Sequence, residues 1–100
     1  MIYRIVSEAE WDAARAAGEF AGSEHDRRDG FLHFSTAAQL AETASKHYTG
    51  RTDLLVLSVD PAALTAPLKW EKSRGGDLFP HLYGALSTSA VRSAKKLPPP

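Results

Sequence analysis

Two short segments of the sequence place a histidine among large aromatic rings. Residues 30–36 read Gly-Phe-Leu-His-Phe-Ser-Thr, and residues 78–84 read Leu-Phe-Pro-His-Leu-Tyr-Gly. An imidazole exchanges protons near neutral pH, and an aromatic ring offers a face on which a planar ligand can stack. Acid–base chemistry on a small aromatic ligand is therefore the chemistry that these two segments could perform, provided that they build one site.

The first segment has the alternation of a β-strand. Leu32 and Phe34 would face the core, whereas Phe31, His33 and Ser35 would share the opposite face. Phe31 beside His33 makes that face a pocket wall rather than open solvent. The alternative is a half-exposed strand whose histidine is an ordinary polar surface residue, and this segment alone leaves both interpretations open.

The second segment combines a rigid and a flexible position around its histidine. Pro80 fixes the backbone ahead of His81, and Gly84 permits a sharp turn after Tyr83. If the segment is extended, its two-residue spacing aims His81 and Tyr83 in one direction, so that Phe79 and Tyr83 could line a pocket with His81. The alternative is an edge strand in which the proline prevents aggregation.

Two charged residues could complete such a site. Arg4 lies on a strand face with Ile2 and Val6, where it needs an anionic partner or ligand unless its head group reaches water. Glu71 ends a predicted strand just before a glycine-rich turn, where it could face the same cavity or be solvated. Replacing either His33 or His81 by alanine is expected to reduce function more than stability, because cleft residues contribute little to packing.

The elements that must position these residues alternate irregularly along the chain. The sequence predicts an α+β fold with a small mixed or antiparallel sheet of about five or six strands, open to being split in two, and two helices packed on it. Capping boxes at Ser7 and Thr36 begin the two helices. The predicted strands are residues 2–6, 31–35, 53–59, 68–71, 78–84 and 91–97, and the predicted helices are residues 8–17 and 37–48.

One globular domain accounts for residues 1–97, followed by a tail of three prolines at residues 98–100. Residues 53–59 are rich in leucine and valine, which predicts a central strand covered on both faces. Residues 19–30 contain little apolar material, which predicts a long exposed connection. The sequence carries no signal for an oligomeric state.

Composition excludes several classes of function. The 12 basic and 12 acidic residues cancel, so nucleic acid is not expected as a partner. No apolar run is long enough to span a membrane and no export signal is visible, which indicates the cytoplasm. The chain contains no cysteine. We expect no bound metal; the weak metal-dependent alternative would join His33 and His81 to Glu71 or His47.

The motifs occur in an order that resembles the bacterial domain-of-unknown-function family 952. The resemblance extends over about residues 2–97. The fold of that family is regarded as related to the ADP-ribosyltransferase superfamily, whose members hold NAD in a cleft between two small sheets. The residues that carry the resemblance are Tyr3, Glu10, Trp11, residues 30–36, Asp60, Pro61, Trp70, Glu71 and residues 78–84.

The resemblance also implies roles for individual residues. It places Arg4 on a diphosphate, Ser35 or Thr36 on a ribose or amide, and His33 beside them. Glu71 or His81 would act on the positive ribosyl centre that forms as a glycosidic bond breaks. Phe31, Phe79 and Tyr83 would stack on the ligand's rings. NAD then enters as a substrate rather than as a resident cofactor.

Three classes of function remain open from the sequence. The first is an enzyme that binds or processes NAD or a related nucleotide by ADP-ribosyl transfer or glycosidic cleavage. The second is a non-catalytic module that binds a small metabolite or nucleotide. The third is the metal-dependent site. In each class the partner is a small molecule.

Overall fold

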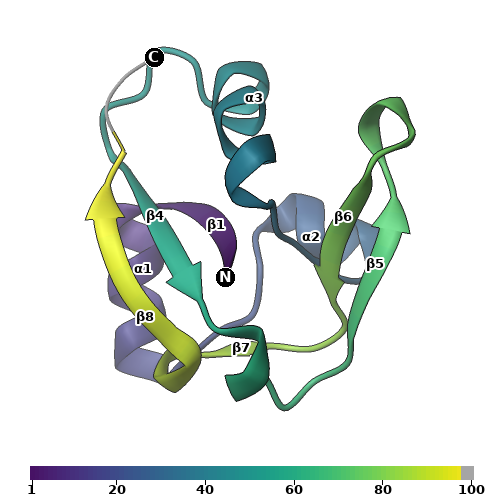
Figure 1. The fold of residues 1–100 in the computed structure, drawn as a ribbon. Coiled ribbons are helices and arrows are strands. Elements are labelled where there is room, and N and C mark those ends of the chain that lie inside the picture. The colour runs from purple at the N-terminus through teal and green to yellow at the C-terminus, as the bar shows by residue number, and fades with distance from the viewer. Residues whose placement is uncertain (98–100) are drawn as a thin grey trace.

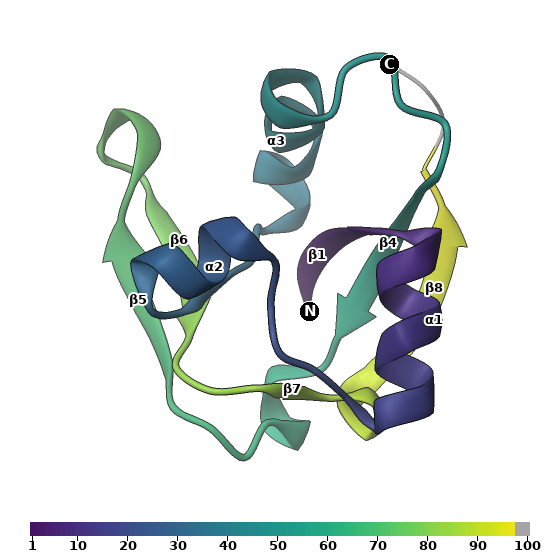
Figure 2. The same ribbon diagram turned by 180° about the vertical axis from the view of Figure 1, so that it is seen from behind.

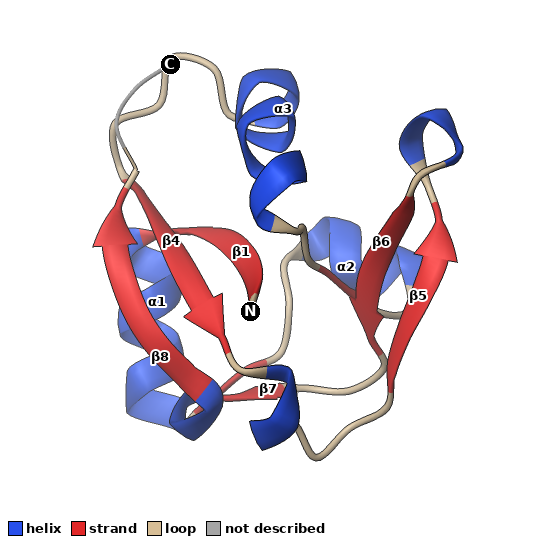
Figure 3. Ribbon diagram, viewed as in Figure 1, coloured by secondary structure: helices blue, strands red, loops and turns tan. Residues whose placement is uncertain are grey.

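A computed structural model describes residues 1–97, and the predicted proline tail lies outside the described residues. In this range the chain is an α+β protein built on two separate three-stranded antiparallel sheets (Figures 1 and 3). The expected α+β class is confirmed, and the sheet is indeed split. The described residues contain eight short strands and three α-helices, more than the five or six strands and two helices expected.

The first sheet contains β1 (Ile2–Ser7), β4 (Leu54–Val59) and β8 (Val91–Lys96), in the order β1-β4-β8. In its antiparallel register Ile2 lies opposite Val59, and Ser7 lies opposite Leu54. The central position of β4 was predicted from its continuous apolar residues, and Leu57 and Val59 are fully buried. This sheet contributes Ile2, Val6, Leu57 and Val59 to the main core.

The second sheet contains β3 (Leu32–His33), β6 (Leu78–Leu82) and β5 (Leu68–Lys72), in the order β3-β6-β5. A short turn at Arg74–Gly76 joins β5 to β6 as a hairpin. The interpretation of the Pro80 segment as an edge strand is wrong, because β6 is the centre of this sheet. The register places His33 directly opposite His81, which brings the two histidine segments together.

The expected exposed connection over residues 19–30 is also wrong. It contains β2 (Glu19–Phe20), which pairs with β7 (Leu86–Ser87), and helix α2 (Glu24–Asp29). Ser23 and Asp26 form a capping box at the start of α2, and Gly30 ends the helix with a φ of 86°. Asp26 is buried, so this helix is held by a polar contact rather than by an apolar stripe.

The other two helices begin and end close to the predicted positions. α1 (Glu8–Ala17) starts with the Ser7–Glu10 capping box, and α3 (Ala37–His47) starts with the Thr36–Gln39 capping box. Viewed from behind, α1 and α2 lie on the same side of the molecule, in front of the first and second sheets respectively (Figure 2). Two single 3₁₀ turns, Pro61–Ala63 and Thr88–Ala90, complete the described elements.

The main core is formed by residues of both three-stranded sheets, of the β2–β7 pair and of α1. Its buried members come from nearly every element, and they include Ile2, Val6, Phe20, Leu32, Phe34, Leu57, Val59, Leu82 and Leu86. Leu32 and Phe34 thus face the core as predicted. Outside the regular ladders, the backbones of Tyr3 and Ser35 exchange two hydrogen bonds of 2.8 Å and tie β1 to the chain that follows β3.

None of the helices formed by the described residues is long and apolar enough to cross a membrane.

Candidate functional site

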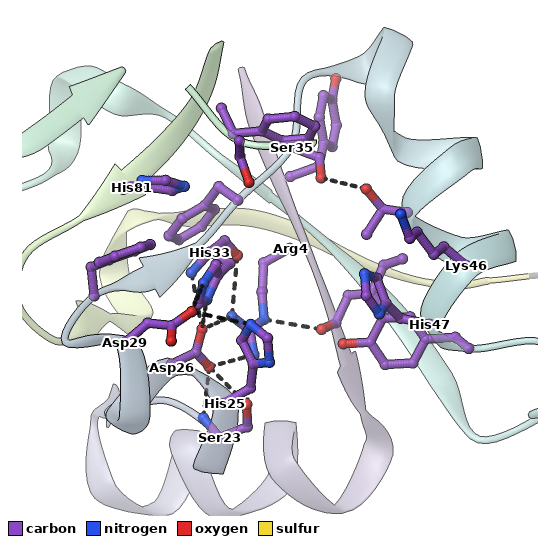
Figure 4. Close-up of a pocket in the computed structure, with 18 of the residues that line it drawn as sticks. Arg4, Ser23, His25, Asp26, Asp29, His33, Ser35, Lys46, His47 and His81 are labelled. Atoms are coloured by element: carbon purple, nitrogen blue, oxygen red, sulfur yellow. Dashed lines mark hydrogen bonds and ion pairs between the residues drawn. The ribbon is translucent and has the colours of Figure 1, made fainter. Parts of the chain in front are cut away.

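A cleft of about 470 Å³ lies between the two sheets, with α2 on one side and α3 on the other (Figure 4). The Tyr3–Ser35 bridge ties β1 to the chain that follows β3, and both of its residues line the cleft. All four histidines of the chain, which come from four different segments, line it: His25, His33, His47 and His81.

Arg4 lies in the wall of this cleft and is buried, with 7% of its side chain exposed. Its guanidinium donates to both carboxylate oxygens of Asp26, at 2.6 Å from Nη1 and 2.7 Å from Nη2. Nη1 also donates to the backbone oxygen of His33. The interpretation that Arg4 reaches water is therefore wrong, and its charge is neutralised by a residue that sequence reasoning did not identify.

Asp26 is the centre of this polar network. Besides the two bonds from Arg4, it accepts from the backbone and hydroxyl of Ser23 and from the backbone and Nδ1 of His33. Burial by itself would raise the pKa of Asp26, but the hydrogen bonds from His33 and Arg4 and the charge of Arg4 outweigh it. The pKa of Asp26 therefore lies well below its ordinary value, and the side chain is an anion.

His33 lies between two carboxylates. Its Nδ1 donates to Asp26 Oδ1 at 2.7 Å, and its Nε2 lies 2.9 Å from Asp29 Oδ2. The same Asp29 oxygen lies 3.3 Å from His25 Nε2. The cleft thus contains a cluster of two histidines and one carboxylate whose ligand atoms all lie within 4.8 Å of one another, at its α2 side (Figure 4).

His81 is buried and oriented by a carboxylate outside the cleft lining. Its Nδ1 lies 2.8 Å from Glu71 Oε1, and the Tyr83 hydroxyl donates to the same oxygen at 2.7 Å. With Nδ1 held by Glu71, Nε2 is the nitrogen that His81 offers to the cleft. The hydrogen bonds from Tyr83 and His81 lower the pKa of Glu71, and the Glu71 carboxylate in turn raises the pKa of Tyr83.

The ring of Phe31 links the two histidines opposite each other. It stacks on His81 with ring centroids 4.0 Å apart and is tilted against His33 at 4.6 Å. The His33 and His81 centroids are 5.6 Å apart. The two histidine segments therefore build one wall, and this wall joins imidazole and phenyl groups.

The remaining expected residues are divided between the cleft and its surroundings. Ser35 and Phe79 line the cleft, and Ser35 Oγ is 3.0 Å from Thr43 Oγ1. Thr36 caps α3 instead. Glu71 and Tyr83 lie behind His81, outside the lining. The roles of these residues in binding or catalysis remain predictions.

Sequence reasoning missed the charged residues that surround the histidines. Lys46 and Lys72 line the cleft, from the end of α3 and the end of β5. Arg4 and Asp26 cancel each other, which leaves these two lysines against Asp29. The cleft is therefore basic although the formal net charge of the chain is zero. The polar capping box at Ser23 was the available signal for α2, which supplies His25, Asp26 and Asp29.

Comparison with known families and structures gives one consistent relationship. Residues 5–94 match a family model described as a protein of unknown function, DUF952. The crystal structure of protein CC0527 from Caulobacter crescentus is similar, with a TM-score of 0.92 and 49% identity, over 97% of this chain and 85% of that chain. The solution structure of CC0527 gives a TM-score of 0.85 and 50% identity, over 96% and 83%. No curated protein matches the chain.

Proposed function

The chain belongs to the DUF952 family, and from the geometry of its cleft we propose that it binds NAD or a related nucleotide and cleaves its glycosidic bond. The observation that carries this proposal is the gathering of all four histidines, two lysines and several aromatic rings in one cleft. A nucleotide combines negatively charged phosphates with a planar base. The lysines complement the phosphates, and the aromatic rings complement the base.

The basic part of the cleft suits the phosphates. Lys46 and His47 lie in the last turn of α3, and Lys72 lies across the cleft at the end of β5. The Arg4 guanidinium, to which the ADP-ribosyltransferase resemblance gives this task, is already held by Asp26. We therefore assign the phosphate contacts to Lys46 and Lys72, and Arg4 supports the wall.

The aromatic part suits a base or a nicotinamide ring. Phe31, Phe79 and Tyr3 line the cleft from three different segments, and Phe31 is already packed against His81. A ring stacked on this wall would bring its glycosidic bond near the two histidines. Offset stacking of this kind is worth about 0.5–1.5 kcal/mol beyond the area that it buries.

His81 is the group that we assign to the reaction. In hydrolysis of NAD, the glycosidic bond breaks and its electron pair leaves with nicotinamide. A water oxygen bonds to the ribosyl carbon, and a water proton passes to His81 Nε2. A carboxylate behind a histidine fixes the orientation of the ring and stabilises its protonated form. Glu71 holds Nδ1 in this way, and so acts as a positioning residue.

A binding module without turnover is the second candidate. It is favoured by the position of Glu71, which lies outside the cleft lining instead of facing a ribosyl centre. In that case the same lysines and rings bind the nucleotide, and His81 only contributes to the wall. The two candidates share the ligand and differ in whether nicotinamide is released.

The test begins with binding. We expect NAD, ADP-ribose or AMP to raise the melting temperature, and adenosine to raise it less. A ligand at 100 times its dissociation constant stabilises the folded protein by about 2.7 kcal/mol. Lys46→Ala and Lys72→Ala should weaken binding of the phosphorylated ligands about tenfold or more. Lys96→Ala is the matched control, because Lys96 on β8 pairs with Glu8 at the start of α1 and does not line the cleft.

The outcomes separate the candidates. No stabilisation by any of these nucleotides at millimolar concentration would contradict the proposed ligand. Where NAD binds, nicotinamide release is followed by chromatography. Release that is lost in His81→Ala, while NAD still binds, supports the hydrolase, and binding with no release leaves the binding module as the function.

A further inference from the structure

We propose that His25, Asp29 and His33 form a binding site for a divalent first-row transition-metal ion. No bound metal was expected from the sequence, which contains no cysteine and no two histidines at helical spacing. The structure provides a different combination, in which a carboxylate lies between two histidines. This inference does not depend on the nucleotide proposal.

The positions of the three ligand atoms follow from the local fold. His25 and Asp29 are four residues apart on α2, so their side chains share one face of the helix. His33 on β3 lies against that face, because the Gly30 turn brings the chain back along α2. Asp29 Oδ2 is 2.9 Å from His33 Nε2 and 3.3 Å from His25 Nε2.

These distances are close to what a bound ion requires. Metal–ligand bonds of about 2.0–2.2 Å place the ligands of a tetrahedral ion roughly 3.3–3.5 Å apart. Asp29 is at the surface and His25 is exposed, so both side chains can make the small adjustment needed. A single ion among the three atoms would replace the present contacts of Asp29 with the two imidazoles.

An independent observation is the support behind His33. Asp26 holds Nδ1 of His33 at 2.7 Å, and Asp26 is itself fixed by Arg4 and Ser23. A histidine that ligates a metal through Nε2 almost always donates its other N–H to a carboxylate or carbonyl, which fixes the ring and increases its basicity. His33 has that partner without any metal present.

A contact of Arg28 opposes the site. Its Nη2 lies 3.1 Å from His25 Nδ1, and since arginine only donates, this contact requires a hydrogen on Nε2 of a neutral His25. Metal binding needs the opposite tautomer. Arg28 is well exposed, so it can turn away, and Arg28→Gln is expected to tighten metal binding.

The ligand set selects the class of metal. Two imidazoles and one carboxylate suit Zn²⁺, Co²⁺ or Fe²⁺, whereas Mg²⁺ and Ca²⁺ prefer oxygen ligands. Three protein ligands leave at least one coordination position open, as in catalytic rather than structural sites. All three residues line the cleft, so the open position would be accessible to a small molecule there.

The experiment measures metal binding directly on the untagged full chain. Calorimetric titration with Zn²⁺ and the visible absorption spectrum of the Co²⁺ complex report affinity and coordination. We expect one ion per chain, with His25→Ala and Asp29→Asn each weakening binding tenfold or more. His25 is an exposed surface residue, so His25→Ala is expected to remain folded, which circular dichroism verifies.

His47→Ala is the matched control, because His47 lines the same cleft without belonging to the cluster. It should keep the affinity for Zn²⁺ and the Co²⁺ spectrum of the wild type. The proposal is overturned if His25→Ala and Asp29→Asn bind Zn²⁺ as tightly as the wild type, or if His47→Ala removes the site.

Discussion

Asp26 gives α2 its place in the molecule. Its carboxylate is buried and accepts hydrogen bonds from Arg4 and His33, which belong to the two different sheets. Removing one partner of a buried ion pair leaves the other charge without compensation, and the loss is far larger than the pair's own net contribution. The residue therefore acts on stability and, through His33, on the cleft.

Asp26→Asn should destabilise the fold by about 3–5 kcal/mol, because the buried Arg4 then has no carboxylate. Asp12→Asn is the control. It removes a carboxylate from an exposed pair with Arg15 of nearly equal length, 2.7 Å, and is expected to cost less than about 1 kcal/mol. Urea unfolding followed by circular dichroism measures both losses, and equal losses would contradict the role given to Asp26.

A second residue-scale prediction concerns the Glu71 carboxylate, which raises the pKa of Tyr83 by accepting its hydroxyl hydrogen. In Glu71→Gln the negative charge that disfavours tyrosinate is gone, so the pKa of Tyr83 should fall toward its ordinary value. Ultraviolet titration of the tyrosines detects the change, and Tyr83→Phe identifies which transition belongs to Tyr83. An unchanged titration in Glu71→Gln would show that the carboxylate does not govern Tyr83.

At the scale of elements, the sequence predicted those helices and strands that are determined by local interactions. α1 and α3 have alanine-rich segments and complete capping boxes, and their first residues were predicted correctly. β4 was recognised from its apolar run. α2 was missed because its six residues contain no apolar stripe, and its stability comes from the contact between Asp26 and Arg4, twenty-two positions away. The cluster of His25, Asp29 and His33 was missed together with this helix.

The turn that leads into α2 is tightly packed, and this gives an element-scale prediction. Gly22 has a φ of 105°, and an added Cβ would lie 2.8 Å from Leu32 Cδ2 and 2.9 Å from Asp26 Cβ. Gly22→Ala should therefore lose about 1–3 kcal/mol to overpacking in addition to backbone strain. Thermal unfolding measures the loss.

Gly50→Ala separates the two contributions. Gly50 also has a positive φ, 82°, but an added Cβ there meets nothing within 4 Å. It should show the backbone cost alone, about 1–2 kcal/mol. If Gly22→Ala is no more destabilising than Gly50→Ala, then the packing of α2 against Leu32 is looser than the structure indicates.

At the scale of the whole molecule, the cleft exists because β1, β4 and β8 form one sheet and β3, β6 and β5 form another. The two sheets stand apart (Figure 1), the Tyr3–Ser35 bridge ties β1 to the chain that follows β3, and residues of α2 and α3 line the cleft. The histidines are spread over residues 25–81, so no local motif contains the site. Sequence could identify the two histidine segments, but the strand register that places His33 opposite His81 is a tertiary property.

The same strand pairing determines when the protein can fold during its synthesis. β1 pairs with β4, whose residues follow some fifty positions later, and β2 pairs with β7 near the other end of the chain. Chains dominated by such distant contacts fold slowly, and their early segments wait without partners. Ile2, Val6 and Phe20 therefore remain uncovered on the ribosome until residues 54–87 emerge. The nascent chain must be kept from aggregating over that interval, and the cleft is among the last features to form.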